Sequence, residues 1–415
     1  MSILVAKKYI KNFENLGFGM FIHFGLYSLI GQGEWVGKLC ADDPKLPVGE
    51  AEYKKLMNAF NPGSMEEIVA FAKRSGAKYI TITTRHHDGF SLYDTCGLSE
   101  YDAPHALCGR DLIKEFVDAC HKYGIVPFFY HTTLEFWNPD FEDNFEKYLE
   151  YLRESIRMLC TNYGKIGGFW FDGNWSVQGE GDVWQEDKLY GLIRELQPEA
   201  MIINNTGLSE NGKLGHPEID SVTFERGRVA PLNREGMEKY VASEVCDSVT
   251  MHWGLAKDFN YKSSKELIER LCDCRRVGAN FLLNFGPNAD GTVPDYPKAI
   301  FGTIGKWIDI FGEAIYEAEP YWWGEGKNFV LKKGDKAYIF CYDLCRKGSA
   351  NVVYAGGREG EYTFKNFPVA LKNVKWMDNG EELECSYENG NLKINITGYP
   401  YGVDYCVRVA CADFE

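Results

Sequence analysis

The stretch Gly168-Phe169-Trp170-Phe171-Asp172-Gly173-Asn174-Trp175 is a short apolar run that ends in a carboxylate and a glycine. Apolar runs of this length are typical of a strand buried on both faces, the kind that a parallel α/β sheet uses. An acid at the end of such a strand lies on the rim where α/β barrels carry their chemistry. Taken alone, Asp172 is slightly better explained as a turn or helix-cap residue, as most aspartates in loops are.

A repeated order of helix, glycine and buried strand precedes and follows this stretch. A capping box from Ser64 to Glu67 predicts a helix that ends at Gly76, before a β-branched strand. Asp111 and Ser263 are the predicted N-caps of two further helices, and a glycine and an apolar strand follow each of these helices. Such a repeat is the signature of a parallel α/β fold.

The repeat predicts a number of strands close to eight. They are expected at residues 19–24, 79–84, 125–130, 168–172, 201–205, 219–225, 248–253 and 280–285. Eight strands in roughly 300 residues fit a (β/α)8 TIM-like barrel. An open doubly wound sheet is the alternative, but it needs a glycine-rich phosphate loop after its first strand, and residues 25–28 offer none.

The pattern changes near residue 325, where short β-like segments are separated by turn signals such as Asn379-Gly380 and Asn389-Gly390. We expect these segments at residues 328–332, 337–342, 351–354, 362–364 and 393–396. The chain is therefore predicted to consist of a catalytic barrel in residues 1–323 and a small antiparallel β-sandwich in residues 324–415.

The composition limits the partners and the compartment. The formal net charge of -15 argues against nucleic acid and against an anionic membrane surface, and it suits a neutral substrate. No stretch reaches the roughly 20 apolar residues that span a bilayer, and the first residues lack the pattern of a signal peptide. Thirteen cysteines without paired zinc-ligand spacing indicate free thiols. We therefore expect a cytoplasmic protein, and the sequence allows a homo-oligomer.

Polar and aromatic side chains occupy the carboxyl ends of seven predicted strands. In chain order they are His23 with Glu34 and Trp35; Arg85, His86, His87 and Asp88; Tyr130 and His131; Asp172; Asn204 and Asn205; Glu225; and His252 with Trp253. Chance would place them at both ends of the strands. Their shared placement predicts a functional site on the carboxyl-terminal rim of the barrel.

Three chemistries compete for this rim. A metal site would need a His-x-His pair or ligands four residues apart on a helix, whereas His86 and His87 are adjacent, so we predict no metal. A serine hydrolase would need a G-x-S-x-G elbow, which is missing. Hydrolysis of a glycoside needs two acids, hydrogen-bonding groups for hydroxyls and aromatic rings for the sugar face. The rim supplies all of these, and Asp172 and Glu225 are the natural pair.

Each of these residues also has a structural interpretation. Glu34 and Asp88 can form ion pairs with Arg85 or Lys38, and a single histidine on the rim is as often a hydrogen-bonded structural residue as a functional one. Trp175 and Trp253 can belong to core or interdomain packing.

Five segments resemble the retaining α-L-fucosidases of glycoside hydrolase family 29. They are Gly19-Met20-Phe21-Ile22-His23-Phe24-Gly25, Gly33-Glu34-Trp35, Thr84-Arg85-His86-His87-Asp88-Gly89-Phe90, Trp170-Phe171-Asp172 and Asn280-Phe281-Leu282-Leu283-Asn284-Phe285-Gly286-Pro287. Together with the β-rich tail, the resemblance covers nearly the whole chain. It implies the same barrel and sandwich, and no cofactor.

The resemblance implies a role for each candidate residue. Asp172 is expected to be the nucleophile and Glu225 the general acid/base, with Glu244 and Glu218 as alternatives for the second role. The fucose pocket is expected to consist of His23, Glu34, Trp35, His86, His87, Tyr130, Trp170 and Trp253, with Trp253 near the sugar methyl. In the expected mechanism, Phe224 also packs on this methyl. Thr206 stands where some relatives have an arginine that contacts the sugar.

The expected activity is therefore that of an exo-acting retaining hydrolase, which releases α-L-fucose from small fucosides or fucosylated oligosaccharides. Two alternatives stay open from the sequence. One is a carbohydrate-binding protein of the same fold without catalysis, and the other is a glycosidase for another deoxy or galacto-configured sugar.

Overall fold

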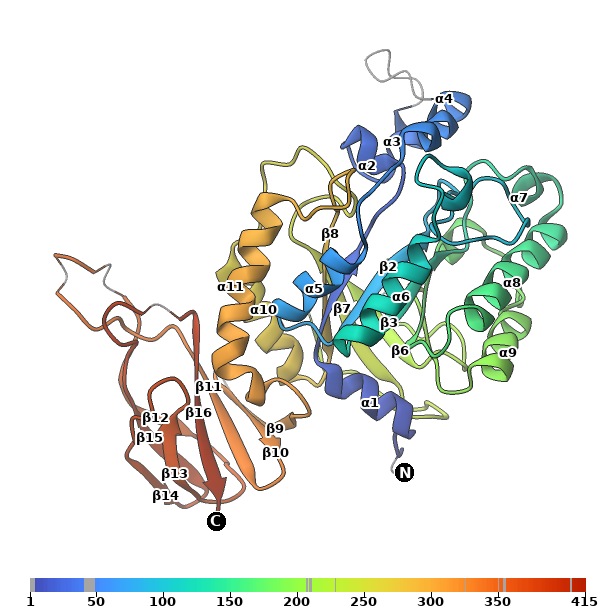
Figure 1. Ribbon diagram of the computed structural model, residues 1–415. Helices are drawn as coiled ribbons and strands as arrows, with labels where there is room; N and C mark the ends of the chain where they lie inside the picture. Colours follow the sequence, from blue (N-terminus) through green and yellow to red (C-terminus); the bar gives the residue numbers. More distant parts are fainter. Residues whose placement is uncertain are drawn as a thin grey trace.

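The computed structural model describes residues 4–40, 49–206, 208, 211–227, 229–324, 326–349, 351–353, 356–403 and 405–415. Eight parallel strands close into a barrel in the order β1 to β8, with β1 paired to both β2 and β8 (Figure 1). They are β1 (Phe18–Ile22), β2 (Tyr79–Arg85), β3 (Val126–Thr132), β4 (Gly168–Asp172), β5 (Met201–Asn204), β6 (Ser221–Glu225), β7 (Ala242–Ser248) and β8 (Asn280–Phe285). The predicted barrel is confirmed.

Helices surround the barrel, and α1 lies at its amino-terminal end (Figure 1). The longer ones are α1 (Lys8–Leu16), α5 (Glu66–Arg74), α6 (Leu112–Tyr123), α8 (Phe145–Thr161), α9 (Glu186–Leu196), α10 (Ser264–Arg276) and α11 (Asp295–Phe311). The short ones are α2 (Tyr27–Ile30), α3 (Val36–Leu39), α4 (Glu50–Lys54) and α7 (Pro139–Asp143), and 3-10 turns lie at Lys55–Ala59, Ala103–His105, Asn174–Ser176 and Gly312–Ala314. From α1, the ring of Phe13 packs 5.6 Å from those of Tyr79 and Phe128. Access to the interior is therefore from the carboxyl ends of the strands.

The predicted helix starts are correct at α6 and α10 and shifted at α5. The Asp111 carboxylate accepts the Lys114 N–H at 2.8 Å, and the Ser263 hydroxyl accepts the Glu266 N–H at 3.2 Å. At α5, Ser64 instead bonds the N–H of the second residue after it, and the helix begins at Glu66. The Asp111 and Ser263 side chains each accept from an N–H of the first helical turn that has no partner within the helix.

The prediction of the seventh strand is wrong: β7 covers residues 242–248, and residues 249–253 form bends rather than a strand. Two acids, Glu244 and Asp247, break the apolar pattern of the true strand. Both are buried, and other elements supply their partners, since Tyr79 donates to Glu244 and Lys262 pairs with Asp247. A local pattern does not contain those partners.

All strands assigned after the barrel are antiparallel, within the described residues. One sheet has the order β13-β16-β11-β10-β9 and the other β12-β15-β14. Their bounds are β9 (Glu319–Trp323), β10 (Phe329–Lys333), β11 (Lys336–Tyr342), β12 (Gly360–Phe364), β13 (Leu371–Trp376), β14 (Cys385–Glu388), β15 (Asn391–Ile396) and β16 (Val407–Phe414). One apolar cluster takes side chains from both sheets, including Ile339 and Leu392. In Figure 1 these strands lie beside α10 and α11, and the Trp307 indole donates to the Val407 carbonyl at 2.9 Å.

The predicted segments of this part are correct in four places and wrong in one. Residues 351–353 form a turn rather than a strand, and Tyr354 lies outside the described residues. The strands β9, β13, β14 and β16 were not predicted. The Asn389-Gly390 turn joins β14 to β15 with positive φ angles of 51° and 75°, as a two-residue hairpin turn requires.

Candidate active site

A cavity of about 220 Å³ opens among the carboxyl ends of the barrel strands. Its lining residues are Phe21, His23, Glu34, Trp35, His86, His87, Tyr130, Trp170, Asp172, Trp175, Asn205, Leu208, Glu225 and Trp253. The ten residues expected to be catalytic or to form the fucose pocket wall are all among them. Phe21 was missed, because in an apolar strand nothing distinguishes a ring that faces the site from one in the core.

Asp172 is held as an anion at the end of β4. Its carboxylate accepts the Tyr130 O–H at 3.1 Å, the Trp175 indole N–H at 3.2 Å and the Asn205 amide at 3.3 Å. The His87 Nε2 lies 3.5 Å from the same group. Burial alone would raise the pKa of Asp172, but the His87 ring and the hydrogen bonds hold that pKa below its usual value.

Glu225, at the end of β6, has a pKa shifted in the opposite direction from that of Asp172. Burial and the nearby charge of Asp172 raise the pKa of Glu225 to about 7, although the Asn205 amide and the Arg226 charge oppose the rise. At neutral pH a large fraction of this carboxyl therefore carries a proton. Asp172 and Glu225 therefore form a pair with one ionised and one largely protonated acid, which is the arrangement needed for a nucleophile beside a general acid.

Asn205 connects the two acids. Its amide nitrogen lies 3.3 Å from Oδ1 of Asp172 and 2.6 Å from Oε2 of Glu225. These two oxygens are therefore no more than about 6 Å apart. The Asn205 carbonyl accepts the Thr223 hydroxyl at 3.0 Å, which fixes the orientation of the amide. The sequence placed Asn205 on the rim but contained no signal for this bridging role.

The three histidines are buried, and their partners differ. The His23 Nδ1 bonds Asn284 at 2.8 Å, and the His87 Nδ1 bonds Thr132 at 2.6 Å. Burial lowers the pKa of His23 to about 4 and that of His86 well below its usual range, so both rings are neutral near pH 7. The Nδ1 of His86 is buried without a hydrogen-bond partner among the described residues.

Glu34 and the tryptophans form the walls of the cavity. The Glu34 carboxylate accepts the backbone N–H groups of Trp253 and Gly254 at 3.1 and 2.8 Å, so it is not the partner of Arg85 or Lys38 considered above. The Trp35 and Trp175 rings are stacked with centroids 6.1 Å apart. Flat aromatic walls next to fixed polar groups suit a sugar ring, which has apolar faces and polar edges.

Asp88 and Arg85 also differ from the ion pair that the sequence suggested. The Asp88 carboxylate accepts the Tyr53 O–H at 2.7 Å, and Arg85 lies 3.8 Å from Glu135. Neither Asp88 nor Arg85 lines the cavity. Both side chains are buried in the protein interior, outside the cavity.

The two alternative acids lie outside the cavity. Glu218 pairs with Arg194 at 3.1 Å, near the start of β6, at the opposite end of the strand from Glu225. Glu244 is fully buried in the barrel interior, where it accepts the Trp170 indole N–H at 3.0 Å. Only Glu225 is placed beside Asp172.

Four other candidates of the rim also lie elsewhere. Phe224 contacts Gly212 rather than the cavity, because neighbouring residues of a strand point to opposite faces and Glu225 takes the inner one. His131 is buried next to Tyr130 but not in the cavity, and His252 is half-exposed and bonds Asp258. The Thr206 hydroxyl donates to the Lys213 carbonyl. An arginine does lie next to a wall of the cavity, since the Arg226 guanidinium is 4.7 Å from the centre of the Trp253 ring.

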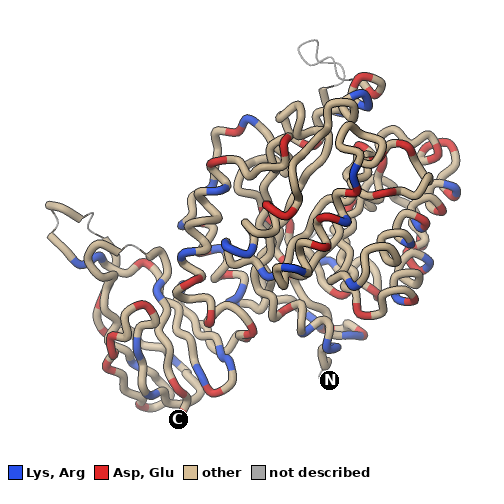
Figure 2. Tube along the Cα trace, in the orientation of Figure 1, with Lys and Arg blue, Asp and Glu red and all other residues tan. Residues whose placement is uncertain are grey.

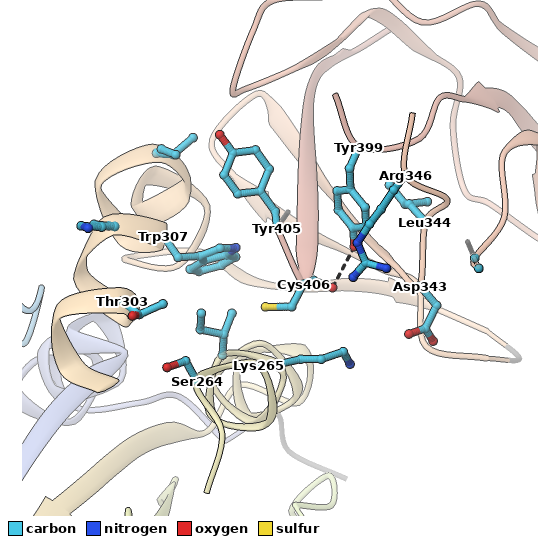
Figure 3. A pocket seen from close by; sticks show the side chains of 15 residues that line it. Ser264, Lys265, Thr303, Trp307, Asp343, Leu344, Arg346, Tyr399, Tyr405 and Cys406 are labelled. Atoms are coloured by element: carbon cyan, nitrogen blue, oxygen red, sulfur yellow. Dashed lines mark hydrogen bonds between the residues drawn. The ribbon is translucent and has the colours of Figure 1, made fainter. Parts of the chain in front are cut away.

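A second cavity, of about 570 Å³, lies between α10, α11 and the strands that follow the barrel (Figure 3). Apolar and aromatic side chains such as Trp307 and Tyr405 form much of it, and Asp343 is its one acid among the described residues. It therefore lacks a pair of acids.

In Figure 2, basic and acidic residues are interspersed along both parts of the chain rather than separated into one-sign faces.

Neither a metal site nor a membrane span is found in the part of the chain that the structure describes. No three side chains from His, Cys, Asp and Glu are grouped there as ligands of an ion. No helix there has the length and apolar character needed to cross a bilayer. All thirteen cysteines are free thiols.

Comparisons with known proteins point to one family. Residues 2–313 match the family model described as alpha-L-fucosidase. The chain is 26% identical to a tissue alpha-L-fucosidase of Rattus norvegicus, over 74% of this chain and 70% of the rat protein. It is 30% identical to the solved alpha-L-fucosidase isoenzyme 1 of Paenibacillus thiaminolyticus, with a TM-score of 0.82 and 98% and 99% of the two chains covered. A Bacteroides thetaiotaomicron GH29 enzyme, solved as a trapped covalent intermediate with 2-fluoro-fucosyl fluoride, shares the fold at 23% identity, with a TM-score of 0.82 and 100% and 98% of the two chains covered.

Proposed function

This chain belongs to the α-L-fucosidase family, glycoside hydrolase family 29, and we propose that it releases terminal α-L-fucose with Asp172 as nucleophile and Glu225 as acid/base. The substrates are fucosylated oligosaccharides or small fucosides. The observation that carries these two roles is the Asn205 amide, which bonds both carboxylates at once.

The reaction proceeds in two displacements. The Asp172 carboxylate attacks the anomeric carbon, while the Glu225 carboxyl gives its proton to the leaving oxygen and the glycosidic bond breaks. Glu225 then removes a proton from water, which displaces Asp172 and releases fucose with retained configuration. The limit of about 6 Å between the carboxylate oxygens supports retention, since retaining enzymes have carboxyl groups about 5–5.5 Å apart and inverting ones about 6.5–9.5 Å.

The cavity accounts for the choice of sugar. Its volume of about 220 Å³ is below the roughly 300–1,000 Å³ typical of pockets for drug-sized ligands, which suits one monosaccharide unit. Neutral His23 and His86 and the carboxylate of Glu34 face the sugar hydroxyls. An epimer would leave these buried groups unpaired, which is costly, and Trp253 offers an apolar surface for the C6 methyl.

Hydrolysis of 4-nitrophenyl α-L-fucoside, followed by proton NMR from the first minute, tests the proposal. We expect α-L-fucose as the first-formed anomer, with β-L-fucose appearing only through mutarotation. The 4-nitrophenyl α-D-galactoside and β-D-fucoside serve as controls and are expected to react far more slowly. β-L-fucose as the first product would contradict retention, and binding of fucose without turnover of any fucoside would favour a carbohydrate-binding protein.

The pH dependence of kcat/KM is expected to form a bell. As the pH rises through about 7, Glu225 loses the proton that the first displacement requires, and the rate falls. At acidic pH Asp172 becomes protonated and can no longer attack, and its lowered pKa moves this limb below the pH at which an ordinary aspartate titrates. Initial rates from pH 3 to 9 measure both limbs, and a flat profile between pH 6 and 9 would contradict the role of Glu225.

Replacing Arg226 with alanine is expected to move the alkaline limb to higher pH. The Arg226 charge favours the ionised form of the neighbouring Glu225, so its removal raises the pKa of that carboxyl further. Arg226→Lys keeps the charge and is the matched control, with a limb close to that of the wild type. An unchanged limb in Arg226→Ala, measured at low ionic strength, would show that the guanidinium does not act on Glu225.

We also propose a cytoplasmic location. All thirteen cysteines are free, and Cys96 is exposed, which is typical of a reducing compartment. Substrates there would be small or imported fucosides. Fractionation of the source cells, with the activity followed in each fraction, tests this location, and activity confined to the extracellular fraction would contradict it.

A further inference from the structure

Glu244 is a buried acid that the proposed reaction does not use. It lies on β7 with no exposed surface, inside the barrel and below the cavity. Two donors from other strands reach its carboxylate, the Tyr79 hydroxyl of β2 and the Trp170 indole N–H of β4, the latter at 3.0 Å. Glu244 therefore ties three strands together across the barrel interior.

This carboxyl is costly to bury. No lysine or arginine forms an ion pair with it in the part of the chain described here, so its two hydrogen bonds are what offsets desolvation. Burial raises the pKa of Glu244 to about 7, and both hydrogen bonds oppose the rise by favouring the ionised form. An apolar side chain would fill the same space at less cost, which indicates a role other than stability.

The connection from Glu244 to the reacting groups is short. The Trp170 ring lines the cavity and stacks on the Tyr130 ring, with centroids 5.7 Å apart and planes 19° from parallel. The Tyr130 hydroxyl donates to the Asp172 carboxylate at 3.1 Å. Trp170 and Asp172 are two residues apart on β4, so both face the interior of the barrel. Any rotation of the indole would displace the floor of the cavity and the donor to Asp172.

We propose that Glu244 is a positioning residue, whose carboxylate fixes the Trp170 indole as the floor of the sugar pocket and keeps Tyr130 aligned with Asp172. The inference rests on the proposed function, because it concerns the same site. Glu244 itself does not contact the sugar. It acts through the hydrogen bond to Trp170.

Glu244→Met tests the proposal, since methionine keeps the length of the side chain and removes both carboxylate acceptors. We expect kcat/KM on 4-nitrophenyl α-L-fucoside to fall about 10- to 100-fold, as a misplacement near 1 Å does, and the Kd of L-fucose to rise. Glu244→Gln is expected to restore kcat/KM to within about threefold, because its carbonyl accepts from Trp170 and its amide donates to the Tyr79 oxygen.

Tyr79→Phe is the matched control. It removes the other hydrogen bond of Glu244 but leaves the bond to Trp170, so kcat/KM is expected to stay near that of the wild type while the Tm falls. Wild-type kcat/KM in folded Glu244→Met would overturn the proposal. So would a loss in Tyr79→Phe as large as that in Glu244→Met, which would indicate a general packing effect.

A second variant covers the case in which Glu244→Met does not fold. Replacing Trp170 with 3-benzothienylalanine keeps the ring and removes only the N–H. The same fall in kcat/KM supports the proposal, and unchanged kcat/KM overturns it. Failure of the proposed function is distinguishable, since the wild-type protein would then turn over no α-L-fucoside at all.

Discussion

Replacing Asp172 with glycine is expected to lower kcat on aryl α-L-fucosides by at least about 10³-fold, and sodium azide is expected to restore turnover with β-L-fucosyl azide as the product. The glycine removes the nucleophile and leaves a space on the β face of the sugar. Azide enters this space and attacks the anomeric carbon directly, so the configuration inverts. The first displacement then ends at a stable azide rather than at an ester of Asp172.

The stereochemistry of the azide distinguishes this role from a structural one. Asp88 is the matched control, because it is a buried acid just after β2 that bonds Tyr53 and does not line the cavity. Asp88→Gly with azide is expected to yield no fucosyl azide, whatever its stability. Formation of α-L-fucosyl azide by Asp172→Gly, identified by NMR, would contradict the assignment of Asp172 as nucleophile.

β4 was predicted at its observed bounds because all its local signals agree. The segment is apolar on both faces, and an acid and a glycine end it abruptly, so no distant contact is needed to recognise it. The same holds for the eighth strand, also predicted at its observed bounds. Once these strands are placed, the shared rim follows, since parallel strands present their carboxyl ends on one side.

β7 shows where local pattern fails. Its acids are tolerated because Tyr79, Trp170 and Lys262 approach them from elsewhere in the fold. A strand with buried acids at two positions does not alternate and is not apolar, so the prediction moved to the residues after it. Glu244 is an alternative acid/base in the sequence because no local motif anchors that glutamate, whereas its partners in the fold place it beneath the pocket.

The chemistry of the acid pair also depends on contacts that no motif records. That Asp172 and Glu225 lie on one rim is visible in the sequence, but their opposite protonation states are not. Those states arise because the His87 ring, Trp175 and Tyr130 surround Asp172 with donors, while burial and the charge of Asp172 outweigh the Asn205 hydrogen bond at Glu225. The sequence therefore identifies the two candidate acids. Only their surroundings in the fold determine which of them acts as nucleophile and which as acid/base.

Replacing Glu225 with glycine is expected to produce a loss that depends on the leaving group. On a fucosylated disaccharide, whose leaving oxygen needs a proton, kcat/KM should fall about 10²- to 10⁴-fold. On 2,4-dinitrophenyl α-L-fucoside, which departs without a proton, kcat/KM should change little. The fucosyl ester of Asp172 then accumulates, because no base activates water, and azide attacks it from the opposite face.

The product with azide is therefore α-L-fucosyl azide, opposite to that from Asp172→Gly. Glu218→Gly is the matched control, since Glu218 stands at the other end of the same segment and pairs with Arg194. It is expected to keep wild-type kcat/KM on both substrates and to form no azide adduct. If Glu225→Gly retains near wild-type kcat/KM on the disaccharide, the proton must come from another group, and the short distance between the two carboxylates would need a different explanation.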